Sequence, residues 1–222
     1  MRRLHVAILA CCLATGAVAG THADPVMRPP AEQLSPSLLR AKAELRDIVT
    51  RRDMRALLAH VRAETRLDFG GSEGREGFRA IWDSDADARQ RLWSTLEGIL
   101  ALPGEARQGG SEYCAPYVFC MDLPGELDPY EALVVTGEDV AIRGQPSSSG
   151  AVLRRVDHVV LNRAEGQPGY KPTSAWTRVA LADGKTGYVS TRWVRSPIDF
   201  RLTLRADDGT GSWWLGFLIA GD

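Results

Sequence analysis

The spacing of apolar residues changes once along the 222-residue chain, near Gly110, and divides the chain into two unlike parts. Before Gly110, apolar residues recur every three or four positions, which is the period of an amphipathic helix. After Gly110, short runs of β-branched and aromatic residues alternate with turn residues, as in a series of short strands. The sequence therefore predicts an α+β fold whose N-terminal region, residues 37–130, is mainly helical and whose second part is all-β.

Helical stretches can be placed in the N-terminal region from capping residues and apolar stripes. One is expected to start at Ser35 or Ser37, a second near Asp53, and a third to cover residues 86–102. A short strand is expected over residues 66–69, before a glycine-rich loop. The second helix is expected to bury four apolar side chains: Met54, Leu57, Leu58 and Val61.

Residues 1–23 have the pattern of a secretory signal peptide. Two arginines near the start precede an apolar stretch, residues 6–19, which is shorter than the roughly 20 residues that a membrane-spanning helix needs. Small residues allow cleavage before Gly20 or before Asp24. We therefore expect a protein exported to the periplasm or the exterior, in which residues 24–36, rich in proline and polar residues, form a linker.

Two alternatives to a cleaved signal peptide stay open at this point. The apolar stretch could remain in place as an uncleaved anchor. It could also belong to a lipoprotein signal that ends at Cys11, although Leu9 fits the lipidation pattern poorly and the apolar run continues past Cys11.

The charge and the hydropathy of the chain argue against two classes of protein, those that bind nucleic acid and those that span a membrane. Charged residues make up 25% of the sequence, both signs are mixed, and the formal net charge is −1. No run is rich in lysine or arginine, so nucleic acid is not expected as a partner. No segment after the N-terminal stretch is apolar enough to cross a bilayer, so the protein is not expected to span a membrane.

Removal of the signal peptide would leave two cysteines, Cys114 and Cys120. An even pair in an oxidising compartment favours a disulfide. Residues six apart in one straight strand are about 20 Å from each other, too far for a bond. Pro116 between them could mark a bend that brings them together, so the disulfide and the straight strand both remain possible readings of the sequence.

Two stretches within residues 137–195 resemble the bacterial SH3-like domain family. That family opens with a V-N-V-R-x-G-P-S-like strand and turn, and residues 140–147 read VAIRGQPS. It closes with a W-x-K-V-x-x-x-D-G-x-x-G-W-V pattern, which residues 176–189 follow in order and spacing, with Trp193 and Val194 beyond. Two positions depart from the family: Gln145 replaces the usual glycine before proline, and Tyr188 stands where tryptophan is common.

The resemblance implies a small SH3-like β-barrel over residues 137–195. Trp176 and Tyr188, which flank the expected hairpin, are large enough to dominate so small a core. It also implies an envelope protein whose binding module takes peptidoglycan or a periplasmic protein or peptide as partner. Aromatic and guanidinium groups supply most of the energy of such interfaces, so the candidate ligand-binding residues are Arg143, Tyr188 and Trp193. The alternative is an envelope-assembly scaffold that has no free ligand.

We expect neither an enzyme nor a cofactor. Cysteine peptidases that accompany SH3-like modules need an activated thiolate, but Cys114 is followed by Ala-Pro and Cys120 by Met-Asp. The acidic residues near position 85 alternate like the start of a calcium loop, but Ala88 and Ser94 occupy the positions that require glycine and glutamate. A cell-wall hydrolase with an unrecognised site is the less favoured alternative.

The C-terminal residues, 198–222, are predicted to form a hairpin. Alternation over residues 200–205 and the apolar run over 213–220 flank a turn at residues 207–211. Because a run that is apolar on both faces needs cover on both faces, we expect the hairpin to extend a sheet begun by residues 66–69 or 113–121. The barrel would then be an insertion into the N-terminal region; the alternative is a hairpin that extends the barrel sheet.

Overall fold

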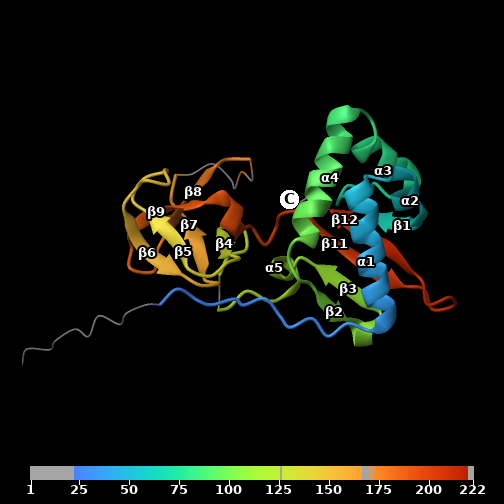
Figure 1. Ribbon diagram of the computed structural model, residues 1–222, viewed down its shortest axis with the longest axis horizontal. Helices are drawn as coiled ribbons and strands as arrows, with labels where there is room; N and C mark the ends of the chain where they lie inside the picture. The colour runs from blue at the N-terminus through green and yellow to red at the C-terminus, as the bar shows by residue number, and fades with distance from the viewer. Residues whose placement is uncertain (1–22, 126, 167–170, 172, 220–222) are drawn as a thin grey trace, which may run out of the picture.

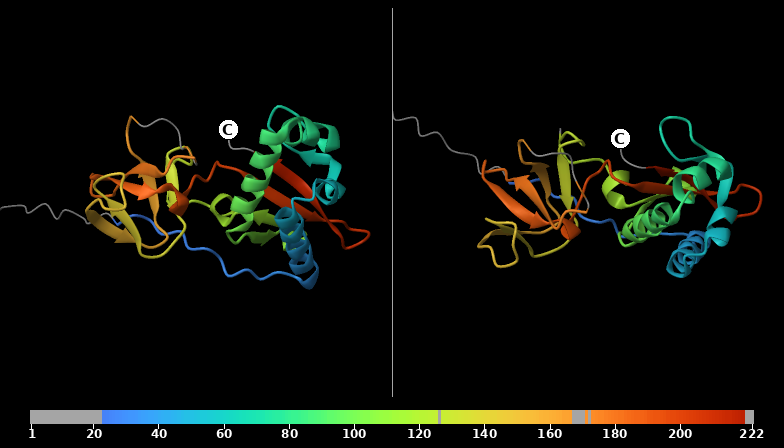
Figure 2. Two further views of the ribbon diagram at one scale, coloured as in Figure 1. Left: turned by 45° about the horizontal axis from the view of Figure 1, so that its top comes forward. Right: turned by 90° about the horizontal axis from the view of Figure 1, so that it is seen from above.

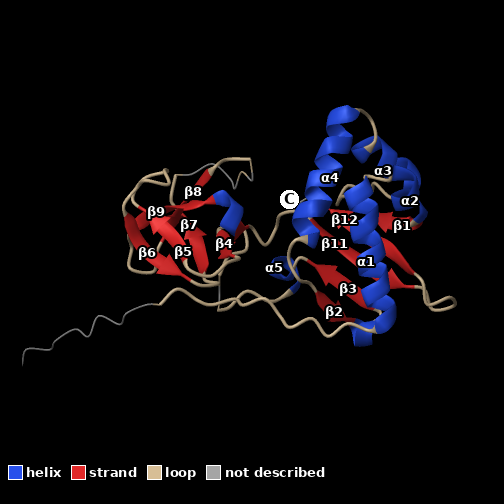
Figure 3. Cartoon of the chain, viewed as in Figure 1, coloured by secondary structure: helices blue, strands red, loops and turns tan. Residues whose placement is uncertain are grey.

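The computed structural model describes residues 23–125, 127–166, 171 and 173–219, and contains two β-sheets with helices mainly on one of them (Figures 1 and 3). The apolar stretch at residues 6–19 and the possible cleavage before Gly20 lie outside the described residues. Within the described residues, no helix is long and apolar enough to cross a membrane.

Side-chain caps explain where the first helices begin. The Ser35 hydroxyl accepts a hydrogen bond of 3.2 Å from the Leu38 amide at the start of α1. Asp53 caps α2 in the same way, and Asp85 caps α4. Each cap satisfies an amide that has no partner inside its helix. The helices are α1 (Pro36–Arg51), α2 (Met54–Ala59), α3 (Gly74–Trp82), α4 (Ala86–Leu100) and α5 (Tyr117–Cys120).

Within the described residues, the first sheet has five strands in the order β1-β12-β11-β3-β2. Strand β12 pairs in parallel with β1, and β11 pairs antiparallel with β3. The C-terminal hairpin thus joins strands from the N-terminal region, and the residues of the second sheet lie between these two parts of the sequence. The strands are β1 (Val61–Arg66), β2 (Glu105–Arg107), β3 (Glu112–Ala115), β11 (Arg201–Ala206) and β12 (Trp213–Ile219).

Helices α1 and α4 lie side by side across one face of this sheet (Figure 2). Their apolar faces meet the inner side chains of β11 and β12 in one continuous core. Leu45 and Leu96 from the helices and Leu202 and Leu215 from the hairpin are all buried within it. The apolar hairpin is therefore covered by helices that are encoded more than 100 residues earlier.

In the part of the chain that the structure describes, the second sheet has seven strands in the order β10-β4-β7-β8-β9-β5-β6. Val140 and Ile142 both point into its core. The turn between β8 and β9 contains Gly184, whose φ of +80° suits glycine. The strands are β4 (Ala132–Val135), β5 (Val140–Arg143), β6 (Val152–Val156), β7 (Val160–Arg163), β8 (Trp176–Ala180), β9 (Thr186–Ser190) and β10 (Val194–Arg195), and a short 3₁₀ helix, η2 (Thr191–Trp193), precedes β10.

The predicted fold class is wrong on two counts. The helices of the N-terminal region do not form a helical unit of their own, because they pack on a sheet that is completed by β11 and β12, and the described chain is built mainly on two sheets. The second part is not a closed barrel, because β10 and β6 stand at opposite ends of the strand order among the described residues. Local motifs specify hairpins, but closure depends on pairing between strands far apart in the sequence, which no local pattern encodes.

Individual strands were also misplaced by the sequence patterns. Val61 was expected on the second helix, but it begins β1, so the first strand occupies residues 61–66 and not 66–69. Residues 113–121 are only partly extended, because α5 follows β3 after Pro116. In both places a short apolar run fits either a helix or a strand, and tertiary pairing decides between them.

The helical turn of α5 brings Cys120 back towards β3, and Cys114 and Cys120 form a disulfide with a Cα–Cα distance of 5.8 Å. The chain bends at Pro116, so residues 114–120 do not form the single straight strand that would have kept the two cysteines apart. Both cysteines are buried.

We call the five-stranded sheet with its helices the first unit, and the seven-stranded sheet the second unit. Residues 24–36 were expected to form a linker, but they contact both units. At the second sheet, the Asp24 carboxylate accepts hydrogen bonds from the Ala182 amide at 2.8 Å and from Arg154 at 2.6 Å. Further along, the Met27 amide donates to the His158 carbonyl at 2.7 Å. We call residues 24–36 the N-terminal strap; at its other end, Glu32 binds residues of the first unit.

Candidate functional site

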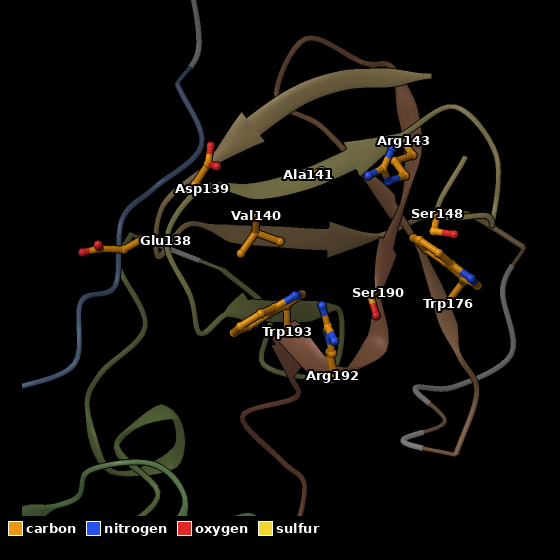
Figure 4. A pocket seen from close by; sticks show the side chains of 10 residues that line it. All are labelled: Glu138, Asp139, Val140, Ala141, Arg143, Ser148, Trp176, Ser190, Arg192 and Trp193. Carbon is orange, nitrogen blue, oxygen red and sulfur yellow. The ribbon is translucent and has the colours of Figure 1, made fainter. Parts of the chain in front are cut away.

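A groove of about 430 Å³ lies on the second unit, between β5 and the segment from the end of β9 to η2 (Figure 4). Two indole rings and two guanidinium groups take part in its walls. The lining residues are Glu138, Asp139, Val140, Ala141, Arg143, Ser148, Trp176, Ser190, Arg192 and Trp193.

The two tryptophans reach the groove from neighbouring parts of one hairpin. Trp176 starts β8 and faces Ser190 at the end of β9 in the strand register. The chain then turns through η2, which presents Trp193 at the groove with 38% of its surface exposed. Both tryptophans therefore lie on regular backbone elements, and neither ring is fully buried.

Gly137 sets the position of the Trp193 ring. A Cβ atom at Gly137 would lie 2.8 Å from Cε3 of Trp193 and 3.0 Å from Cζ3. These separations are below van der Waals contact, so a side chain at this position would displace the ring. The ring packs directly on the backbone at Gly137 for this reason.

The charges in the groove are segregated, as Figure 4 shows. Glu138 and Asp139 lie at one end, and Arg143 lies at the other, near Trp176. The Arg143 guanidinium donates a hydrogen bond of 2.7 Å to the Gly150 carbonyl, which holds it in place. The Arg192 guanidinium lies 5.0 Å from the centroid of the Trp193 ring, within the range of a cation–π interaction.

One of the two carboxylates at the acidic end is paired with a charge outside the groove. Asp139 forms an ion pair of 2.7 Å with Arg155. Glu138 lies 3.7 Å from Nε2 of His158, which is buried. The groove therefore has Arg143 and Trp176 at one end and two carboxylates at the other, with Trp193 between them (Figure 4), an arrangement suited to an extended ligand that carries both charges.

Two of the three predicted ligand-binding residues, Arg143 and Trp193, line this groove. Tyr188 is not among the described residues that line it, although it lies opposite Arg143 in the β5–β9 pairing. Trp176 was expected in the core, but it is only partly buried and lines the groove instead. Arg192 was not predicted, because nothing in its sequence context separates it from other exposed arginines.

No protein-family model, curated protein or solved structure matches this chain.

The disulfide lies away from the groove, and neither His60 nor His158 is among the residues that line it. Cys114 and Cys120 belong to the first unit, and their sulfur atoms are bonded to each other. His60 follows α2 in the first unit, whereas His158 precedes β7 in the second. In the described part of the chain, no group of three histidine, cysteine or acidic residues is placed to hold a metal ion.

Proposed function

We propose that this is an exported, non-catalytic envelope protein that binds an extended peptide, from a cell-wall component or a periplasmic protein, in the groove between Trp176 and Trp193. The observation that carries the proposal is the presence of two accessible indole rings with Arg143 and Arg192 around one groove. Tryptophan and arginine are the residues that most often dominate the energy of protein interfaces.

The charge distribution favours a peptide over a purely apolar ligand. A carboxylate on the ligand can pair with Arg143 or Arg192, and an amino group can approach Glu138 or Asp139. The indole faces supply apolar contact between these ends. Peptides, including cell-wall stem peptides, carry both kinds of charge on an extended backbone.

The sequence resemblance and the N-terminal pattern support the same proposal. Residues 137–195 resemble a family of bacterial binding modules, and the groove lies within that range. Residues 1–23 have the pattern of an export signal. Export would bring the groove into the compartment where cell-wall peptides are found.

A non-catalytic role is proposed because the two cysteines outside the N-terminal signal pattern are joined in a disulfide. A cysteine nucleophile must be a free thiolate with a base nearby. Neither Cys114 nor Cys120 meets this requirement while they are bonded to each other.

Co-sedimentation with purified peptidoglycan, followed by calorimetric titration with soluble stem peptides, tests the proposal. We expect Trp193→Ala and Arg192→Gln each to weaken binding by about tenfold or more, which corresponds to about 1.4 kcal/mol. Arg178→Gln, which removes an arginine that does not line the groove, should bind as the wild type does. If the wild-type protein does not bind peptidoglycan, stem peptides or peptides of periplasmic extract, the proposal is wrong and the alternative of a scaffold without a free ligand takes its place.

A further inference from the structure

A second pocket lies on the first unit, between α2 and α3, and combines three arginines with an apolar floor. It has a volume of about 530 Å³. Helices α2 and α3 lie at the end of the first unit that is distant from the second sheet, in all views (Figures 1 and 2). The pocket is therefore separate from the groove. Its lining residues are Met54, Arg55, Leu58, Ala59, Arg75, Arg79 and Asp83.

The three arginines converge from two helices. Arg55 lies in the first turn of α2, and Arg75 and Arg79 lie one turn apart on α3. Nε of Arg75 donates hydrogen bonds to the carbonyls of Leu58 at 3.1 Å and Val61 at 3.0 Å. These bonds fix the Arg75 side chain at the junction of α2 and β1, while Arg55 and Arg79 remain exposed beside it.

This positive charge is not neutralised within the described part of the chain. No described carboxylate forms an ion pair with Arg55, Arg75 or Arg79, although other arginines of the same unit have such partners. Asp83, the acidic residue of the pocket, is held by Arg89 at 2.6 Å. Like charges one helical turn apart destabilise a helix, so Arg75 and Arg79 gain from an external anion between them.

The apolar side chains of the pocket favour an anion that carries an apolar part. Met54, Leu58 and Ala59 line the pocket beside the guanidinium groups. A free inorganic anion would gain nothing from these side chains, whereas an acyl chain attached to a phosphate would remove them from water. Arginine binds phosphate oxygens through paired, charge-assisted hydrogen bonds.

We propose that the α2–α3 pocket binds an anionic phospholipid, with the phosphate between Arg55, Arg75 and Arg79 and the first carbons of an acyl chain on Met54 and Leu58. This site goes beyond the peptide groove and does not depend on it. A protein with both sites would hold a peptide at one end while its other end rests on an anionic membrane surface.

Vesicle co-sedimentation tests the proposal with three forms of the protein: the wild type and two double variants. All three are expressed from the full sequence and purified from the cells in the same way. The wild type should bind phosphatidylglycerol vesicles and not phosphatidylcholine vesicles. Arg55→Gln with Arg79→Gln should lower the partition coefficient on phosphatidylglycerol by about thirty-fold, equivalent to about 1 kcal/mol for each arginine. The control, Arg40→Gln with Arg91→Gln, removes the same charge from exposed positions outside the pocket and should bind as the wild type does.

An equal loss in the two double variants would show general charge attraction and would overturn the proposal, as would wild-type protein that ignores phosphatidylglycerol. Because all forms share the same N-terminus, its contribution to binding cancels in the comparison. Soluble short-chain phosphatidylglycerol should also shift the methyl signal of Met54 in an NMR titration. Inorganic phosphate that binds the pocket as tightly as this lipid would show a simple anion site and would contradict the lipid assignment.

Discussion

The phenolic hydroxyl of Tyr113 donates a hydrogen bond of 2.8 Å to the carboxylate of Glu32, which joins the N-terminal strap to strand β3. The same carboxylate accepts a hydrogen bond of 2.8 Å from the Gly104 amide and forms an ion pair with Lys42. Lys42 is only 3% exposed. Burial alone would raise the pKa of Glu32, but these hydrogen bonds outweigh it and hold the pKa below its usual value.

We expect Glu32→Gln to lower the free energy of unfolding by about 2–3 kcal/mol, because it leaves the buried Lys42 ammonium without its counter-charge. Urea denaturation followed by circular dichroism measures this loss. Glu44→Gln serves as a control, because that carboxylate is 61% exposed and should change stability little. Equal stability of wild type and Glu32→Gln would show that the strap is not anchored by this contact.

The effect of Glu32 should depend on pH in one direction. Because its pKa is lower in the folded protein, its contribution is fully present above the unfolded pKa of about 4.3 and is lost as the pH falls through the folded pKa. The stability difference between wild type and Glu32→Gln should therefore shrink as the pH is lowered below about 4. A difference that stays constant down to the acid limit of folding would contradict this.

Trp176→Ala should destabilise the protein by less than about 2 kcal/mol, because the ring is only partly buried and lies in the groove wall. Ile142→Ala, at a fully buried position of the same unit, should cost about 2–5 kcal/mol. Thermal unfolding of both variants gives the comparison. A larger loss for Trp176→Ala than for Ile142→Ala would place Trp176 in the core and remove it from the groove.

Gly137→Ala should weaken peptide binding by about tenfold through displacement of the Trp193 ring, without new charge or lost hydrogen bonds. Gly144→Ala is the matched control, since the nearest atom to its added methyl group is Cδ2 of Leu153, at 3.6 Å. Calorimetric titration of both variants measures the effect. If the two variants bind equally well, the position of Trp193 does not matter to the ligand.

Truncation after Pro197 should unfold the first unit, because it removes β11 and β12 from the middle of the sheet. The core then loses Leu202 and Leu215, and the helices lose the surface that covers them. Limited proteolysis should cut throughout residues 35–120, and the helical signal in circular dichroism should fall. A truncated protein whose helices stay folded and protected would show that the hairpin is dispensable.

Local signals in the sequence located many elements of the fold but not their partners. The caps at Ser35 and Asp53 and the turn at Gly184 depend on residues within a few positions of one another, so they can be recognised without the structure. Val61 and residues 66–69 were misassigned because a short apolar run has no period long enough to separate helix from strand.

Some residues of the candidate sites could be named from the sequence, and others only from the structure. Arg143 and Trp193 could be named from the family resemblance and their chemistry, whereas Trp176 could not be separated from a core residue until its exposure was seen. Arg55 and Arg79 are 24 positions apart and lie in no basic run, so only the tertiary structure, in which residues of α2 and α3 line one pocket, brings them together.

By itself, the sequence determined the helix caps, the strand hairpins, the export pattern and the chemistry that each side chain could offer. The tertiary structure alone decided that β11 and β12 complete a sheet begun by β1 and β3, that the second sheet stays open, and which arginines and tryptophans share a pocket. The physical reason is the distance along the sequence between the residues that interact. Capping and turn formation are local interactions, whereas strand pairing and apolar burial join residues whose separation in the sequence carries no signal of their contact.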